Sequence, residues 1–157
     1  MPHNPDNAKY WIWLTTLAGF GFHRIKTIIS SFESAERVYK LSSSDIDGLS
    51  FLSTELRSVL KNKNLDYANK IIEECFARSI DIITYEDDEY PDRLRFISTP
   101  PYVLYRKGKH FDYDRIPVIA IVGTRNATPY GIRVCEDIAK DLSLNGALIV
   151  SGMAKGI

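Results

Sequence analysis

The chain has 157 residues, of which 45% are hydrophobic and 25% are charged, and its formal net charge at pH 7 is zero. This length suits one ordinary domain or two small ones, and the composition is typical of a globular protein. Zero net charge argues against a protein that coats nucleic acid through bulk electrostatics, although residues 103–157 carry eight Lys and Arg against five Asp and Glu. No apolar run approaches the length of a membrane span and no secretory signal pattern is present, so we expect a cytoplasmic protein.

The first half of the chain predicts a helical module over residues 1–78. Apolar residues recur every three or four positions, most clearly in the segment 65–79. The aromatic residues Tyr10, Trp11 and Trp13 could stack nucleic-acid bases, but their place on the first helix favours the core. Helices are expected over residues 10–17, 23–31, 34–41, 53–62 and 65–79, with a Ser-, Asp- and Gly-rich loop after the third.

The second half changes to strands and one helix, which predicts an α/β domain with a parallel sheet over residues 79–157. The segment 118–122 is apolar at every position, as expected for a strand covered on both faces. Thr128 is expected to cap the following helix, and Gly146 to end it in the left-handed conformation. Strands are expected over residues 80–86, 102–108, 118–122 and 147–152, and the helix over residues 129–145. The chain stops where a further helix should begin, so we expect an incomplete domain and an α+β chain of two modules.

Two cysteines, Cys75 and Cys135, fall on the apolar faces of predicted helices. We expect both to be buried free thiols in a reducing compartment.

Two glycine-containing loops, residues 123–131 and 151–156, follow the last two strands. The first loop lacks the second glycine of a dinucleotide fingerprint, because position 125 is arginine, and it lacks the Gly-Lys-Ser/Thr of a Walker loop. Ligands of parallel sheets bind at the carboxyl ends of the strands, and two helix N-termini with the Arg125 guanidinium would suit a phosphate group. In the alternative, Arg125 pairs with a carboxylate and the glycines only permit tight turns.

No catalytic or metal-binding set is evident in the sequence. The three histidines, His3, His23 and His110, are scattered and are expected on the surface. The acidic run 86–89 is expected to be a solvated turn, and Ser151 lacks a nucleophile-elbow motif and an evident base. We therefore expect no enzymatic activity, no cofactor and no metal.

Three segments carry a family resemblance. Residues 87–108 read DDEYPDRLRFISTPPYVLYRKG, residues 120–131 read AIVGTRNATPYG and residues 149–157 read IVSGMAKGI. In this order they resemble the DNA-processing protein A family, also called DprA or Smf, and the likeness covers residues 85–157. The resemblance implies a Rossmann-like domain that binds single-stranded DNA and loads a RecA-type recombinase onto it during natural transformation, as a homodimer and without enzymatic activity.

Carried over by position, the resemblance implies a DNA phosphate pocket that uses Gly123, Thr124, Arg125, Ser151 and Gly152. The family's dimer surface and its further pocket residues would lie beyond residue 157.

The segment LTTLAGFGFHRIKTII, residues 14–29, is similar to a helix-hairpin-helix, whose hairpin amides face DNA phosphates, so the helical module is expected to be of helix-hairpin-helix or SAM-like type. Gly19 and Gly21 match the pattern, while Phe22 and His23 replace the proline and lysine often found there. The segment is either a purely structural turn or an accessory DNA contact through Gly19, Gly21 and Arg24.

Two further functions remain open at this point. One is an enzyme of a related Rossmann-like group, a nucleoside-monophosphate phosphoribohydrolase, and the other is a nucleotide-sensing module. Residues 1–157 do not supply the downstream glycine-rich motif and glutamate that such enzymes carry, which favours the single-stranded-DNA-binding recombination mediator.

Overall fold

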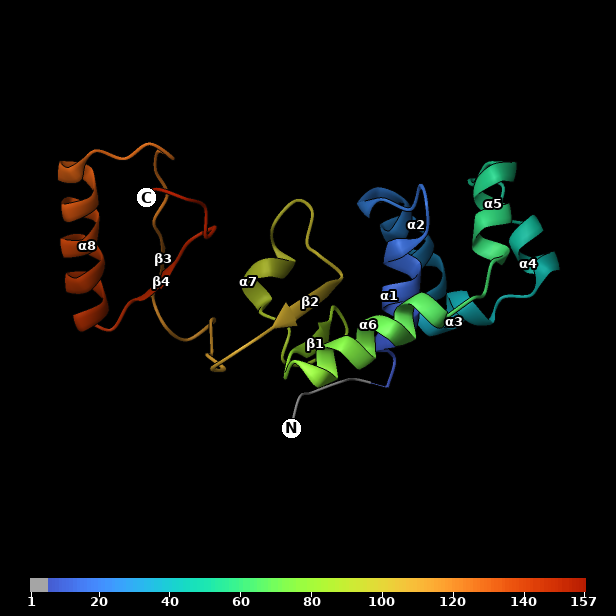
Figure 1. The fold of residues 1–157 in the computed structure, drawn as a ribbon. Coiled ribbons are helices and arrows are strands. Elements are labelled where there is room, and N and C mark those ends of the chain that lie inside the picture. Colours follow the sequence, from blue (N-terminus) through green and yellow to red (C-terminus); the bar gives the residue numbers. More distant parts are fainter. Residues whose placement is uncertain (1–5) are drawn as a thin grey trace. The chain divides into compact units, whose positions relative to one another are not determined.

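The computed structural model describes residues 6–157, so His3 lies outside the described residues. The chain divides into two compact units (Figure 1). The first unit runs to Tyr90 and continues from Leu94 to Lys109, and the second contains Pro91–Arg93 and His110–Ile157. Among the described helices, none is long and apolar enough to cross a membrane.

The first unit begins with six helices, and the five predicted helices are all present with boundaries within a few residues of those expected. Three of the helices begin at a serine whose hydroxyl accepts a backbone N–H, namely Ser34, Ser42 and Ser53. The helices are α1 (Ala8–Thr16), α2 (Phe22–Phe32), α3 (Ala35–Lys40), α4 (Ser43–Asp47), α5 (Thr54–Lys61) and α6 (Asp66–Ala77).

Helix α4 replaces the loop that we expected after α3. Its five residues are too few to show an amphipathic repeat. A capping box forms it instead, since the Ser42 hydroxyl accepts from the Asp45 N–H and the Asp45 carboxylate accepts from the Ser42 N–H. Ile46 is fully buried and anchors this turn of helix in the core.

Strands β1 (Asp81–Thr84) and β2 (Val103–Arg106) pair antiparallel, with Ile82 opposite Tyr105. The prediction that they belong to a parallel sheet is wrong. Their apolar side chains pack with the helices, because Ile82 and Tyr102 belong to the same buried cluster as Trp11 of α1. The first compact unit therefore extends past the predicted module boundary at residue 78 and reaches Lys109.

The core of the first unit contains the aromatic residues of α1, as expected. Trp11 and Trp13 are buried, and Tyr10 is half-buried and packs against the cluster. Tyr102 lies between two rings, with centroids 5.2 Å from Trp11 and 5.5 Å from Phe22 and interplanar angles of 14° and 18°. This stack joins the helices to the start of β2.

The second unit contains β3 (Val118–Ala120), α8 (Pro129–Leu144) and β4 (Leu148–Val150). The strands pair parallel, with Ile119 opposite Ile149, so the predicted strand-helix-strand unit is confirmed. Helix α8 runs alongside this pair (Figure 1) and contacts β4. The expected Thr128 cap and the positive φ of Gly146, 86°, are both present. The short helix α7 (Asp92–Arg95) precedes these elements in the chain.

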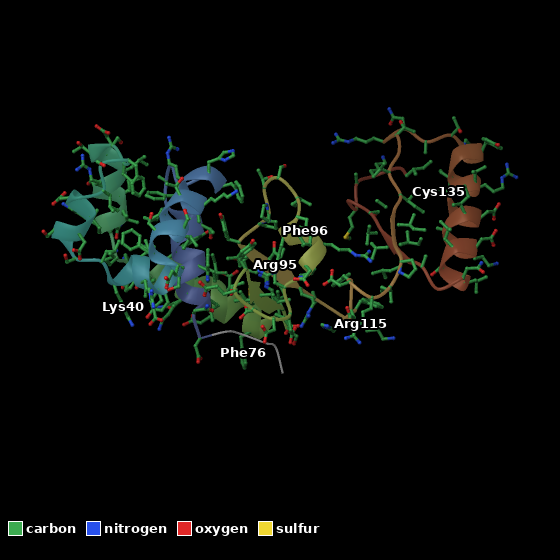
Figure 2. All side chains as sticks on the ribbon, turned by 180° about the vertical axis from the view of Figure 1, so that it is seen from behind. Lys40, Phe76, Arg95, Phe96, Arg115 and Cys135 are labelled. Carbon is green, nitrogen blue, oxygen red and sulfur yellow. The ribbon has the colours of Figure 1, made fainter. Side chains whose placement is uncertain are left out.

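The expectation that the third strand segment is covered on both faces is wrong for the described chain. No residue of this unit is fully buried in its described part, and Val122 is 81% exposed. Cys135, labelled on α8 in Figure 2, is half-buried rather than buried, whereas Cys75 of the first unit is buried as expected. Two short strands and one helix cover too little surface to form a closed core.

Candidate nucleic-acid interface

The two predicted loops meet at the end of the β3–β4 pair. The Ile157 N–H donates to the Thr124 carbonyl oxygen at 3.2 Å. Gly156 has a φ of 105°, and a Cβ placed on it would overlap the Thr124 carbonyl oxygen. The end of the second loop therefore packs directly on the backbone of the first.

Gly123 serves this contact. A Cβ on Gly123 would lie 2.7 Å from Cγ2 of Ile157, so the missing side chain makes room for that isoleucine. The family resemblance implies that Gly123 also belongs to a DNA phosphate pocket, and that role stays a prediction. In the structure the position needs glycine for a contact within the chain.

Arg125 projects from the first loop and is exposed. Within residues 6–157 it makes no hydrogen bond or ion pair, so the carboxylate partner that we considered is not observed in the described chain. The Asn126 N–H donates to the Thr124 hydroxyl at 3.2 Å and stabilises the turn that carries Arg125. The guanidinium is thus held on an ordered turn with its donors available.

An open hollow of about 470 Å³ lies beside Arg125. Lys155 of the second loop also lines it, and this lysine was not selected from the sequence. The signal for it was its place in the loop after β4, which parallel pairing brings to the same sheet edge as Arg125. The residues lining the hollow are Arg125, Asn126, Ala127, Ile132, Lys155 and Gly156.

The N-terminus of α8 offers fewer donors than we expected. The Thr128 hydroxyl accepts from the Gly131 N–H at 3.1 Å, and Pro129 has no N–H. In the described chain, Tyr130 is the residue of this first turn whose N–H makes neither a backbone nor a side-chain hydrogen bond. The expected second helix N-terminus is not observed, because residues 151–157 form no helix. Positive charge at this edge therefore comes mainly from Arg125 and Lys155.

Ser151 and Gly152 follow β4 directly and are exposed. The Ser151 hydroxyl accepts from the Met153 N–H at 3.2 Å, and Met153 adopts a positive φ of 54°. The hydroxyl thus shapes the turn of the second loop, and neither residue lines the hollow beside Arg125. Their role in binding phosphate stays a prediction.

The glycine turn between α1 and α2 is tightly built. Gly19 has a φ of 80°, and a Cβ on it would lie 2.9 Å from Cδ2 of Leu56. Arg24 donates from Nη1 to the Gly19 carbonyl oxygen at 2.7 Å, yet its side chain stays exposed. Gly21 is extended and begins α2. One donor of Arg24 thus closes the turn, and its remaining donors are available.

The acidic run is not merely a solvated turn, which corrects our expectation. The Asp87 carboxylate accepts from the Thr84 N–H at 2.6 Å and from the Thr84 hydroxyl at 2.8 Å. Glu89 forms an ion pair with Arg106 at 2.9 Å. These carboxylates stabilise the antiparallel pair of β1 and β2. The described residues contain no cluster of three or more metal-ligating side chains.

Arg95 packs on the segment that follows β1. Arg95, labelled in Figure 2, lies with its guanidinium carbon 4.7 Å from the ring centroid of Tyr85 and 4.8 Å from that of Tyr90. Burial raises the pKa of Tyr90 to about 12 and that of Tyr102 to about 12. These shifts belong to packed core groups, not to an acid–base pair in a cleft.

Comparison with known proteins relates this sequence to a family. The family model described as DNA recombination-mediator protein A matches residues 81–157. The chain is 30% identical to Protein Smf of Synechocystis sp. over 98% of its own length, and 40% identical to DNA processing protein DprA of Bacillus subtilis over 51%. It is 28% identical to Protein Smf of Borreliella burgdorferi over 76%.

The chain spans 39%, 27% and 37% of the lengths of these three relatives. The matched region begins at β1, close to the change of periodicity at residue 79, and includes both glycine loops. The three motifs that resembled DprA therefore lie inside the matched region. The chain belongs to the DNA recombination-mediator protein A family, whose curated relatives are named Smf or DprA.

Proposed function

We propose that this chain is part of a single-stranded-DNA-binding recombination mediator of natural transformation, and that it acts without enzymatic activity or a cofactor. The observation that carries the proposal is the pair of exposed cations, Arg125 and Lys155. Both line one hollow, and they come from different loops at the carboxyl ends of β3 and β4. Neither makes an ion pair within the described chain.

A backbone phosphate fits this hollow better than a neutral ligand does. The Arg125 guanidinium can hold phosphate oxygens through two parallel hydrogen bonds, and Lys155 adds a point charge. The N–H groups of Thr124 and Arg125 donate no backbone hydrogen bond in the part of the chain that the structure describes. Gly123 makes room for Ile157 of the second loop, Gly152 follows β4 in that loop, and the Ser151 hydroxyl shapes its turn.

The accessory contact at Gly19, Gly21 and Arg24 is part of the proposal, because the free donors of Arg24 lie beside the N-terminus of α2. Loading of a RecA-type recombinase and formation of a homodimer through regions beyond residue 157 are proposed from the family resemblance. So is the Rossmann-like character of the domain that the β3–α8–β4 unit begins.

The test compares binding with hydrolysis. The purified protein is titrated against a fluorescently labelled single-stranded oligonucleotide, and it is separately incubated with nucleoside monophosphates while release of free base is followed. We expect saturable, salt-dependent binding and no base release. Base release at an enzymatic rate would favour the phosphoribohydrolase. Tight binding of a nucleotide without binding of the oligonucleotide would favour the sensing module.

A further inference from the structure

A second hollow, of about 370 Å³, lies within the first unit, between the start of α2 and the segment 99–103. We call it the hairpin groove, because Phe20 and Gly21 of the turn between α1 and α2 line it. Its volume falls in the range of small-ligand pockets. None of its lining residues is charged. They are Thr15, Phe20, Gly21, Phe22, Ile25, Thr99, Pro100, Pro101, Tyr102, Val103 and Tyr105.

An aromatic stack ends at this groove. Trp11 and Tyr102 are buried and stack nearly parallel, and Phe22 stacks on Tyr102 at 18°. Phe22 is half-buried and lines the groove, as Tyr102 does. A planar ring entering the groove would therefore meet an ordered aromatic platform whose inner members cannot move aside.

Together, the two chain segments that line the groove carry positive charge and no negative charge. Residues 7–32 contain Lys9, Arg24 and Lys26 but no Asp or Glu, and residues 96–105 carry no charge at all. Arg24 and Lys26 are exposed. Lys26 lies one helical turn after Phe22, so both side chains are on the same face of α2. An apolar slot bordered by cations suits a planar apolar group joined to anions.

The groove also offers polar atoms for the edge of such a group. The Thr15 hydroxyl donates to the Trp11 carbonyl oxygen at 2.8 Å, which leaves its oxygen free to accept. The exposed Thr99, in the segment before β2, also lines the groove. Hydroxyls tolerate different donor and acceptor patterns, as binding without sequence preference requires.

We propose that the hairpin groove takes one unstacked base of a single-stranded nucleic acid, which stacks on Phe22 while Lys26 and Arg24 contact the neighbouring phosphates. The proposal rests on the proposed function for its ligand class, and it adds a base-binding site that is separate from the phosphate site at Arg125.

The experiment compares two labelled oligomers of equal length, oligothymidylate and an abasic oligomer with the same phosphates. Phe22→Leu keeps an apolar side chain but removes the aromatic face. Base–aromatic stacking contributes about 1–3 kcal/mol per base, so the variant should bind oligothymidylate roughly fivefold to a hundredfold more weakly. Its affinity for the abasic oligomer should equal that of the wild type.

Phe76→Leu is the matched control, because Phe76 (labelled in Figure 2) is 66% exposed on α6 and does not line the groove. It should bind both oligomers as the wild type does. Lys26→Gln should reduce the magnitude of the negative slope of log K against log salt by about 0.7 for both oligomers. Lys70→Gln on α6 should leave this slope unchanged. Circular dichroism confirms that each variant is folded.

Equal affinity of folded Phe22→Leu and wild type for oligothymidylate would overturn the proposal and would leave the groove to a protein segment. An equal loss for both oligomers would overturn it too, because stacking requires a base. Arg125→Ala separates the two sites, since it should weaken both oligomers alike. An Arg125→Ala variant that binds normally, beside a defective Phe22→Leu, would contradict the proposed phosphate site and support the groove.

Discussion

The two units of this chain are built in different ways. The first closes a core around α1, in which Trp11, Ile12 and Leu14 are completely buried. The second, in its described part, has no completely buried residue, and Ile138 of α8 is 49% exposed. Packing thus determines the first unit, whereas backbone pairing, a capped helix and close loop contacts determine the second. The candidate phosphate site lies in the unit with the smaller core.

The strongest test of this contrast removes one large side chain from each unit. Trp11→Ala should lower the free energy of unfolding of the first unit by about 3–5 kcal/mol, because it leaves a cavity under Tyr102. Val122→Ala should change stability by no more than roughly 0.5 kcal/mol, because the side chain is mostly exposed. Urea unfolding followed by circular dichroism measures both. Similar losses in the two variants would remove the distinction.

The pH dependence of stability tests the core of the first unit from another side. Tyr90 and Tyr102 ordinarily titrate near 10, and burial raises the pKa of each to about 12. Between pH 10 and 12 the folded chain keeps protons that the unfolded chain has released, so stability that is fully present below pH 10 should be lost as the pH rises through 12. Tyr102→Phe should reduce this loss, and the mostly exposed Tyr67→Phe should not.

Titration of Lys63 should raise the free energy of unfolding with pH, over a lower pH range than the tyrosines. Burial lowers the pKa of this lysine from 10.5 to about 8. Between these values the unfolded chain binds more protons than the folded one, so the contribution of Lys63 to stability should increase from pH 8 to 10.5. The urea midpoint should therefore rise and then fall across pH 8 to 12, and Lys63→Met should remove the rise. A midpoint that falls steadily from pH 8 in the wild type would contradict this account of Lys63.

A smaller effect is expected from the loop contact of the second unit. Gly156→Ala places a Cβ against the Thr124 carbonyl oxygen and should separate the two loops, which should weaken single-stranded DNA binding severalfold. Gly108→Ala is the matched control, because Gly108 has the same φ of 105° and open space around its Cα. Anisotropy titrations of both variants measure the difference. If the two variants bind alike, the packing of the loops does not shape the site.

Much of this architecture follows from local sequence signals. Amphipathic spacing predicts the long helices, and Thr128, Pro129 and Gly146 mark both ends of α8 because caps act over a few residues. The partner of a short strand is not encoded locally, so the antiparallel pairing of β1 with β2 and their packing on the helices were missed. Helix α4 was missed for a related reason, since five residues are too few to show a period.

The candidate site was predictable to a similar degree. Parallel pairing explains why both loops lie at one edge, and an arginine in a loop after a strand is a visible signal. The close packing of Ile157 against Gly123 was not predictable, because it is a contact between residues far apart in the chain. The aromatic platform at Phe22 was not predictable for the same reason, since Tyr102, which stacks on Phe22, lies far from it in the sequence.

The central claim is that the first glycine loop holds a DNA phosphate through Arg125, and one titration tests it most directly. A hydrogen bond to a charged group contributes about 1.5–3 kcal/mol, so Arg125→Ala should weaken single-stranded DNA binding roughly tenfold to a hundredfold. It should reduce the magnitude of the negative slope of log K against log salt by about 0.7, equally for all base sequences. Arg133→Ala, on the exposed side of α8, should change little. A folded Arg125→Ala variant with wild-type affinity and slope would contradict the account.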